Sequence, residues 1–228
     1  MKKEIVIFGS SETAELAKYY FEHDSPYQVV AFTVDDGFVK ENSFEGKPLL
    51  GFSEATQKYP PGKVDMHVAL SYGKLNQLRQ EKYLQAKTAG YHLASYRHSH
   101  SSISPDFFHG ENCFILENQT IQPKVMFGEN VMVWSGNHFG HGCSIGSHAY
   151  ISSHVVVCGH SRIGERSFMG VNSAVKDFIQ IAEDCFVGMG ASVTCNLAPG
   201  SVALGPTAET YPADDRRSRA LKKAYFKI

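Results

Sequence analysis

An apolar residue falls on every sixth position between Ile103 and Val193, with polar or small residues filling most of the places between. The series runs through Ile103, Ile115, Ile121, Phe127, Val133, Phe139, Ile145, Ile151, Val157, Ile163, Met169, Val175, Ile181, Val187 and Val193, and His109 interrupts it. A helix repeats near 3.6 residues and a strand near 2, so neither explains a sixfold period. The period is typical of a parallel β-helix, whose triangular coil takes about 18 residues per turn.

The first hundred residues lack this period and alternate apolar runs with helical patterns. Expected strands cover 4–8, 28–34, 64–70 and 91–96, and expected helices cover 12–21 and 74–89. Alternation at these lengths predicts a Rossmann-like α/β domain with a parallel sheet at 1–100. We expect an all-β parallel β-helix at 101–198 and a C-terminal extension at 199–228.

Composition narrows the possible partners. The chain has 228 residues, with 22 Lys and Arg against 23 Asp and Glu, so no overall charge favours nucleic acid. No apolar run approaches the ~18 residues of a membrane span, and the N-terminal run at 5–8 is too short for a secretory signal. We therefore expect a cytoplasmic protein with neither a nucleic-acid partner nor a membrane span.

The five cysteines are an odd number and lack CxxC spacing. Cys113, Cys143 and Cys185 each lie two residues before an apolar position of the series. Free cysteine packs as a small hydrophobic residue. We therefore predict that these three lie inside the coil.

Two polar turns follow the first two expected strands. Gly9, Ser10 and Ser11 follow the first, and Asp35 and Asp36 follow the second. Parallel sheets bind ligands beyond the carboxyl ends of their strands, where a helix N-terminus offers N–H groups to phosphate. Because the dinucleotide glycine fingerprint is absent, these residues favour a mononucleotide or nucleotide sugar over a nicotinamide cofactor. The alternative is an ordinary turn beside a solvated acidic loop.

Five histidines lie close together at His138, His141, His148, His154 and His160. Zinc-binding β-helix carbonic anhydrases place two of their histidine ligands five residues apart, and the gaps here do not fit, so we expect no metal. His141 comes two residues after an inward position and therefore lies on the outer surface. There it can act as a general base, since neutral imidazole accepts protons near neutral pH. The alternative is a surface or subunit-contact histidine, and for the other four a structural role is favoured.

The C-terminal extension carries a basic cluster on an expected short helix. Its members are Arg216, Arg217, Arg219, Lys222, Lys223 and Lys227. Such a cluster is usually a solvated face, and contact with a phosphate-bearing ligand is the alternative.

The chain resembles the family of sialic-acid O-acetyltransferases and bacillosamine-type N-acetyltransferases over nearly its whole length. The stretches that carry the resemblance are 5–9, 34–36, 69–73 with Asn76 and Arg79, 141–146, 168–173 and 187–191. The resemblance implies an α/β Rossmann-like domain, a left-handed β-helix, acetyl-CoA as co-substrate, and a homotrimer with acetyl-CoA between neighbouring coils.

The resemblance also implies roles for particular residues. His141 matches the general base, and Gly159 matches the position whose backbone N–H binds the thioester carbonyl. Gly205 lies in the motif near the end of the coil and is expected to contact the cofactor. The expected substrate-binding residues are Gly9, Ser10, Ser11, Asp35, Asp36, Trp134, Asn137 and His138.

The chain departs from the family pattern near the base. Gly142 stands where an acidic residue usually orients the imidazole, so a backbone carbonyl or Asn137 would have to serve. Trp134 replaces an asparagine near the acceptor sugar, and its indole can stack on a sugar ring. The phosphate turn reads Ser10-Ser11-Glu12, and Gly205 begins Gly-Pro-Thr-Ala in place of Gly-x-Pro-Ala.

These features predict an acetyltransferase that acts on the amino group of a nucleotide-linked 4-amino-4,6-dideoxy sugar in surface-glycan synthesis. A second interpretation is a sugar O-acetyltransferase with a sialic-acid-like acceptor, which the altered phosphate turn favours. A third is a β-helix scaffold that binds nucleotide sugar without turnover, suggested by Gly142 and Trp134.

Overall fold

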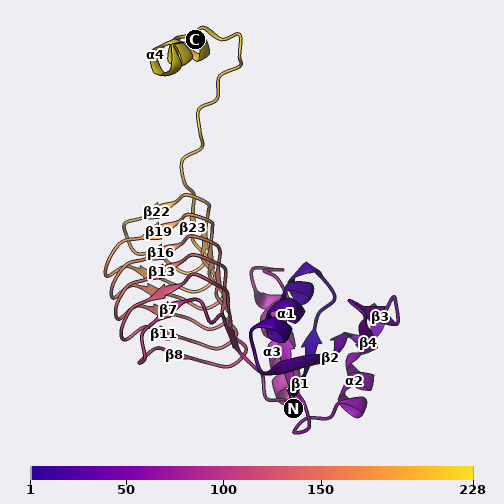
Figure 1. Ribbon diagram of the computed structural model, residues 1–228. Coiled ribbons are helices and arrows are strands. Elements are labelled where there is room, and N and C mark those ends of the chain that lie inside the picture. Colours follow the sequence, from indigo (N-terminus) through magenta and orange to yellow (C-terminus); the bar gives the residue numbers. More distant parts are fainter. Residues whose placement is uncertain (1, 228) are drawn as a thin grey trace.

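The computed structural model describes residues 2–227 and shows an α/β unit beside a tall coil of short strands. Figure 1 shows the α/β unit packed against the N-terminal end of the coil, with one helix carried away from both on an extended segment.

The α/β unit is built on a five-stranded sheet with strand order β3-β4-β2-β1-β5, in which β3 and β4 are antiparallel and the other pairs are parallel. The strands are β1 (Lys3–Phe8), β2 (Tyr27–Val34), β3 (Ser43–Phe44), β4 (Lys47–Gly51) and β5 (Asp65–Val68). The helices are α1 (Glu12–His23), α2 (Phe52–Lys58) and α3 (Gln77–Thr88), with a 3₁₀ turn at Asp36–Phe38. Apolar residues of α1 pack on one face of the sheet, and those of α2 and α3 pack on the other.

Three local expectations need correction. The strand expected at 91–96 is wrong over most of its length, because Leu93 forms a single bridge to Met66 and Tyr96 pairs with Phe114 of the coil. The helix expected from residue 74 begins at Gln77, since 74–76 adopt left-handed φ angles of 52°, 50° and 66°. β4 and α2 were not expected, because their apolar residues are too few to give a clear period.

The coil is a parallel β-helix with three sheets. We name them sheet I (β22-β19-β16-β13-β10-β7), sheet II (β20-β17-β14-β11-β8) and sheet III (β23-β21-β18-β15-β12-β9-β6). Every strand is two residues long and pairs with the strand one coil away, as Phe139 does with Val157. The hexapeptide β-helix predicted from the sequence is therefore confirmed.

The strands of the coil follow one another from sheet to sheet in chain order. Sheet I contains β7 (Ser102–Ile103), β10 (Thr120–Ile121), β13 (His138–Phe139), β16 (Val156–Val157), β19 (Ala174–Val175) and β22 (Ser192–Val193). Sheet II contains β8 (Phe108–His109), β11 (Met126–Phe127), β14 (Ser144–Ile145), β17 (Arg162–Ile163) and β20 (Gln180–Ile181). Sheet III contains β6 (Tyr96–Arg97), β9 (Phe114–Ile115), β12 (Met132–Val133), β15 (Tyr150–Ile151), β18 (Phe168–Met169), β21 (Phe186–Val187) and β23 (Val202–Ala203).

The inside of the coil is a continuous apolar column that includes Phe127 and Phe139. Cys113, Cys143 and Cys185 are completely buried in it, which confirms their predicted place. The inward apolar residues thus stack in register. Because of this stacking, residues 18 positions apart in the chain occupy equivalent places on successive coils.

The two units share an apolar core. Phe114, Met132 and Tyr150 point outward from sheet III and pack with Phe21 of α1. The strand β6 joins the units covalently and is itself part of sheet III. The outer face of sheet III is therefore covered by the α/β unit at Phe114, Met132 and Tyr150.

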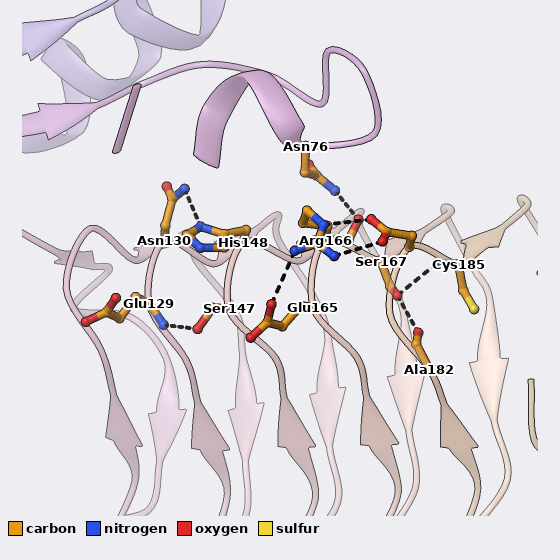
Figure 2. A network of polar contacts seen from close by, with 11 residues as sticks. Asn76, Glu129, Asn130, Ser147, His148, Glu165, Arg166, Ser167, Ala182 and Cys185 are labelled. Atoms are coloured by element: carbon orange, nitrogen blue, oxygen red, sulfur yellow. Dashed lines mark hydrogen bonds and ion pairs between the residues drawn. The ribbon is translucent and has the colours of Figure 1, made fainter. Parts of the chain in front are cut away.

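A polar ladder runs along the coil corner between sheets II and III, which faces α3 (Figure 2). Asn130 and His148 meet through Nδ2 and Nδ1 at 2.9 Å, and Arg166 forms two bonds to Asp184 at 2.7 and 2.8 Å. Asn76, before α3, donates to the carbonyl of Arg166 at 2.8 Å. Asn130, His148, Arg166 and Asp184 all have positive φ, a region that asparagine, aspartate and histidine tolerate better than most residues.

Arg79 fixes α3 to this corner. Its buried guanidinium donates to the carbonyls of Asn130, His148 and Ala149 and to the side chain of Asn76. Burial lowers the pKa of Arg79 to about 10. Because the partners are neutral, this contact depends on hydrogen-bond geometry rather than on an ion pair.

The helix α4 (Arg216–Phe226) lies apart from both units (Figure 1). Its first turn is capped by Asp215, whose side chain accepts from the backbone N–H of Arg217 at 2.7 Å. None of the helices in residues 2–227 is long and apolar enough to cross a membrane.

Candidate active site

His141 lies on the exposed corner between sheets I and II, after β13 and before β14. Gly159 occupies the same corner one coil higher, directly over the imidazole ring. A Cβ atom at Gly159 would lie 3.0 Å from Cε1 and 3.3 Å from Nε2 of His141. Glycine at position 159 therefore makes room for the ring beneath it.

The N–H of Gly159 donates to no acceptor in the part of the chain that the structure describes. The neighbouring N–H groups are used, since His160 donates to the carbonyl of His141 and Cys158 donates to that of Val175, each at 3.0 Å. A free donor beside an exposed imidazole can bind a carbonyl oxygen whose negative charge grows during reaction.

Gln122, one coil below, holds His141 from the other side. Its Oε1 accepts the backbone N–H of His141 at 2.9 Å and lies 3.4 Å from Nδ1 of the same residue. Within residues 2–227, neither Asn137 nor a backbone carbonyl forms a hydrogen bond with the His141 ring. The Asn137 side chain is directed into the coil, where it accepts from the N–H of Val155 at 2.6 Å and donates to the carbonyl of Trp134.

His160 packs beside His141 from the coil above. The two rings meet edge to face with centroids 4.8 Å apart, and His160 stacks on Phe178 with centroids 5.1 Å apart. A Cβ atom at Gly142 would lie 2.8 Å from Nδ1 of His160. Gly142 therefore leaves the space that the second imidazole fills.

A second candidate site is a pocket of about 640 Å³ at the carboxyl ends of β1 and β2. Its lining includes Gly9, Ser10, Ser11 and Asp35, so the structure brings these four together. Gly9 has a φ of 139°, and a Cβ there would lie 2.7 Å from the carbonyl oxygen of Ala69. This turn accordingly requires glycine.

Asp36 is not part of this lining. Its carboxylate accepts from the backbone N–H of Ser53 at 2.9 Å and from the Ser53 hydroxyl at 2.5 Å, at the start of α2. These two bonds lower the pKa of Asp36 and fix its side chain at α2.

Lys82 also lines this pocket and carries a positive charge. This residue was not identified from the sequence. Its Nζ lies 2.8 Å from Asp35 and 2.7 Å from Glu81. Burial opposes the charge on this amine, but the hydrogen bonds to the two carboxylates raise its pKa overall. Lys82 and Asp35 thus form a charged pair in the lining, which also contains Lys40 and Glu41 among its apolar residues.

The remaining residues that were expected to bind substrate or cofactor are Trp134, His138 and Gly205. Trp134 follows β12 and packs in the core between the units, with its Nε1 donating to the hydroxyl of Tyr150. His138 points outward from sheet I, three residues before His141, and is half-buried. Gly205 packs against the last coil, where a Cβ would lie 2.5 Å from the carbonyl oxygen of Met189. In residues 2–227, no cluster of histidine, cysteine or carboxylate side chains has the arrangement of a metal site.

The His141 corner and the pocket lie on opposite sides of one chain. Sheet III packs on the α/β unit, whereas His141 lies at the corner between sheets I and II, which is opposite sheet III. A ligand that starts in the pocket therefore does not meet the His141 of the same chain without crossing the coil.

Comparison with known proteins supports the description of the coil as a hexapeptide β-helix. Residues 124–159 match the bacterial transferase hexapeptide family (six repeats). The acyl-(acyl-carrier-protein)–UDP-N-acetylglucosamine O-acyltransferase of Sinorhizobium fredii is 27% identical over 113 residues, which cover 46% of this chain and 42% of that protein. This chain thus spans less than half the length of that curated relative. The residues that match the bacterial transferase hexapeptide family lie wholly within the coil.

Two solved structures share the fold of nearly the whole chain. The acetyltransferase domain of PglB from Neisseria gonorrhoeae, in complex with acetyl coenzyme A, is 19% identical with a TM-score of 0.79, covering 92% of this chain and 100% of that one. A mutant of perosamine N-acetyltransferase from Caulobacter crescentus, in complex with CoA and GDP-perosamine, is 23% identical with a TM-score of 0.80, covering 92% and 97%. The combination of an α/β unit and a hexapeptide coil is thus shared with these proteins.

Proposed function

We propose that this protein transfers an acetyl group from acetyl-CoA to the amino group of a nucleotide-linked 4-amino-4,6-dideoxy sugar. The observation that carries the proposal is the exposed imidazole of His141 beneath Gly159, whose backbone N–H has no acceptor in the described chain. The two groups supply a base and an oxyanion donor at one point, which direct acyl transfer requires.

In this mechanism His141 Nε2 removes a proton from the sugar amine as its nitrogen attacks the thioester carbonyl. The Gly159 N–H receives the developing oxyanion, an interaction often worth about 3 kcal/mol in the transition state. The tetrahedral intermediate collapses with cleavage of the C–S bond, and the proton held by His141 passes to the CoA thiolate.

No acyl-enzyme is required, and the buried cysteines are poorly suited to form one. Cys113 and Cys143 are completely buried in the coil, and burial raises the pKa of each thiol to about 12. Their thiolates would be scarce near neutral pH. Direct attack on the thioester fits this arrangement better than a covalent intermediate does.

The pocket of the α/β unit is the proposed site for the nucleotide. Gly9, Ser10 and Ser11 stand before the N-terminus of α1, where backbone N–H groups favour phosphate. Lys82, whose amine is paired with Asp35 and Glu81, is a further polar group of the same lining. The complexes of similar proteins with acetyl coenzyme A, or with CoA and GDP-perosamine, support this choice of donor and acceptor.

The position of the pocket favours a homotrimer. Because the pocket and His141 lie on opposite sides of one chain, the acceptor bound by one copy would reach the His141 of a neighbour, with acetyl-CoA between two coils. Gly205, near the last coil, is the proposed further contact for the cofactor. We place the reaction in the cytoplasmic synthesis of surface glycans.

The test is release of CoA thiol from acetyl-CoA with a panel of UDP-, dTDP- and GDP-linked amino sugars. His141→Ala should lower kcat at least about 100-fold, since general-base catalysis typically contributes that much. Gly159→Ala should lower kcat because its Cβ displaces the imidazole. The matched control is His154→Ala, which removes an exposed histidine from a different corner of the coil. Wild-type protein that releases no thiol with any acceptor would refute the proposal.

A second candidate is O-acetylation of a free, sialic-acid-like sugar. The turn Gly9-Ser10-Ser11 favours it, because it has a single glycine and a free sugar needs no pyrophosphate cradle. Thermal stabilisation by nucleotides, measured with and without sugar, separates the candidates, since a ligand stabilises the folded state that binds it. Stabilisation by free sialic acids alone would favour O-acetylation.

A further inference from the structure

We infer that Gln122 is the positioning residue that fixes the tautomer of the His141 imidazole, in the place that a carboxylate would otherwise take. The inference rests on the proposed function for its catalytic meaning, although the tautomer itself is a property of the resting protein.

The orientation of the Gln122 amide follows from a backbone contact. The N–H of His141 lies 2.9 Å from the amide, and an N–H can only donate. The atom that receives it must therefore be the oxygen Oε1 rather than the NH₂ group. This settles by hydrogen-bond chemistry an assignment that geometry alone leaves open.

The same oxygen then determines which imidazole nitrogen carries the proton. Oε1 lies 3.4 Å from Nδ1 of His141, and a carbonyl oxygen can only accept. Nδ1 must donate, so the proton of the neutral ring is on Nδ1 and the lone pair is on Nε2. The ring edge at Cε1, which joins the two nitrogens, lies beneath Gly159, where a Cβ would be 3.0 Å from Cε1 and 3.3 Å from each nitrogen. Gln122 thus leaves Nε2 as the basic nitrogen of a ring that lies beneath the proposed thioester site.

His160 contacts the His141 ring from the coil above, on the side opposite Gln122. Its imidazole meets that of His141 edge to face at 4.8 Å, and it fits there because Gly142 has no side chain. It is the titratable group in ring contact with His141 in residues 2–227. The charged residues of the same corner are Lys124 in the coil below, Asp106 two coils below, and Lys176 and Asp177 two coils above.

A neutral amide acts differently from a carboxylate at this position. Both groups accept a hydrogen bond from Nδ1–H and so fix the ring. A carboxylate also stabilises the positively charged imidazolium and therefore favours the protonated form of His141. With Gln122, His141 is oriented without an attached negative charge. Gln122→Glu should therefore keep the tautomer and move the acidic limb of the pH–rate profile to higher pH.

The first experiment reads the tautomer directly. Long-range ¹⁵N–¹H correlation NMR of the full-length protein distinguishes Nδ1–H from Nε2–H imidazole, and His141→Gln identifies the signals. We expect Nδ1–H in wild type and loss of this preference in Gln122→Leu. An Nε2–H ring in wild type, or an unchanged ring in Gln122→Leu, would overturn the inference. Because no turnover is needed, this result is independent of whether the proposed acetyl transfer occurs.

The second experiment measures kinetics in the same variants. Gln122→Leu should lower kcat about 10- to 100-fold, the usual effect of losing a partner that orients a functional histidine, with little change in KM for acetyl-CoA. Gln122→Glu should restore most of kcat and shift the acidic limb of kcat/KM upward by about one pH unit. Gln180→Leu, an exposed glutamine on sheet II, is the matched control and should match wild type. Equal losses in the Leu and Glu variants without a pH shift would indicate a merely structural role and refute the inference.

Discussion

Replacement of His148 by asparagine should make the protein more resistant to mild acid. Burial, together with the positive charges of Arg79 and Arg166, lowers the pKa of His148 to about 4. In the unfolded chain the same imidazole takes up a proton below an ordinary pKa of about 6.5. The unfolded state therefore binds more protons than the folded state between these values, and the stability contributed by neutral His148 is lost as pH falls from about 6.5 to about 4.

The magnitude follows from the two pKa values. Each pKa unit corresponds to about 1.4 kcal/mol, so about 2 kcal/mol is lost between pH 7.5 and pH 5 and about 3 kcal/mol below pH 4. His67 contributes a similar amount, because complete burial lowers its pKa to about 4 as well. His148→Asn should therefore remove about half of the loss that wild type shows.

The assay is urea denaturation at pH 7.5 and pH 5. Asparagine suits this position because it tolerates the φ of 63° and already occupies the corner one coil below, at Asn130. Lost packing against Tyr83 lowers stability equally at both pH values and cancels in the comparison. His154→Asn is the matched control, since His154 has a similar φ of 58° but is exposed. Parallel pH dependence in wild type and His148→Asn would refute the reasoning.

Two further predictions concern the folded state. Phe139→Ala should lower the free energy of unfolding by about 3–5 kcal/mol, because Phe139 is completely buried in the coil and its loss leaves a cavity; urea denaturation at neutral pH measures this. Arg79→Met should lower the free energy of unfolding by roughly 2 kcal/mol or more, because the buried carbonyls of His148 and Ala149 lose their donor. Thermal denaturation followed by circular dichroism measures this loss, and an unchanged Tm would contradict the prediction.

The six-residue period explains why the corner that carries His141 was predictable. Once Phe139 and Val157 are placed inside and one coil apart, His141 must lie outside and Gly159 must lie above it. Gln122 belongs to the same column, directly below Gly140, but its role depends on a side-chain conformation that the period does not specify. The three neighbours of the ring lie at fixed offsets from it: Gly159 is 18 residues after His141, and Gln122 and His160 are 19 residues before and after it.

The place of Trp134 was not predictable in the same way. The period assigns residues to the inside, a face or a corner, but it does not say which face the α/β unit covers. That choice depends on the apolar residues that point outward from sheet III, such as Met132 and Tyr150. Trp134 joins their cluster, and its expected contact with the acceptor sugar remains a prediction.

The strand β6 belongs to the α/β unit by its position in the chain and to the coil by its hydrogen bonds. The two units are accordingly joined by a paired strand rather than by a free linker. An exchange of the α/β unit for that of another protein must carry over β6 and the outward side chains Phe114, Met132 and Tyr150. A graft cut at the apparent boundary near residue 100 would divide a continuous core, whereas a redesign confined to the turns after β1 and β2 leaves that core intact.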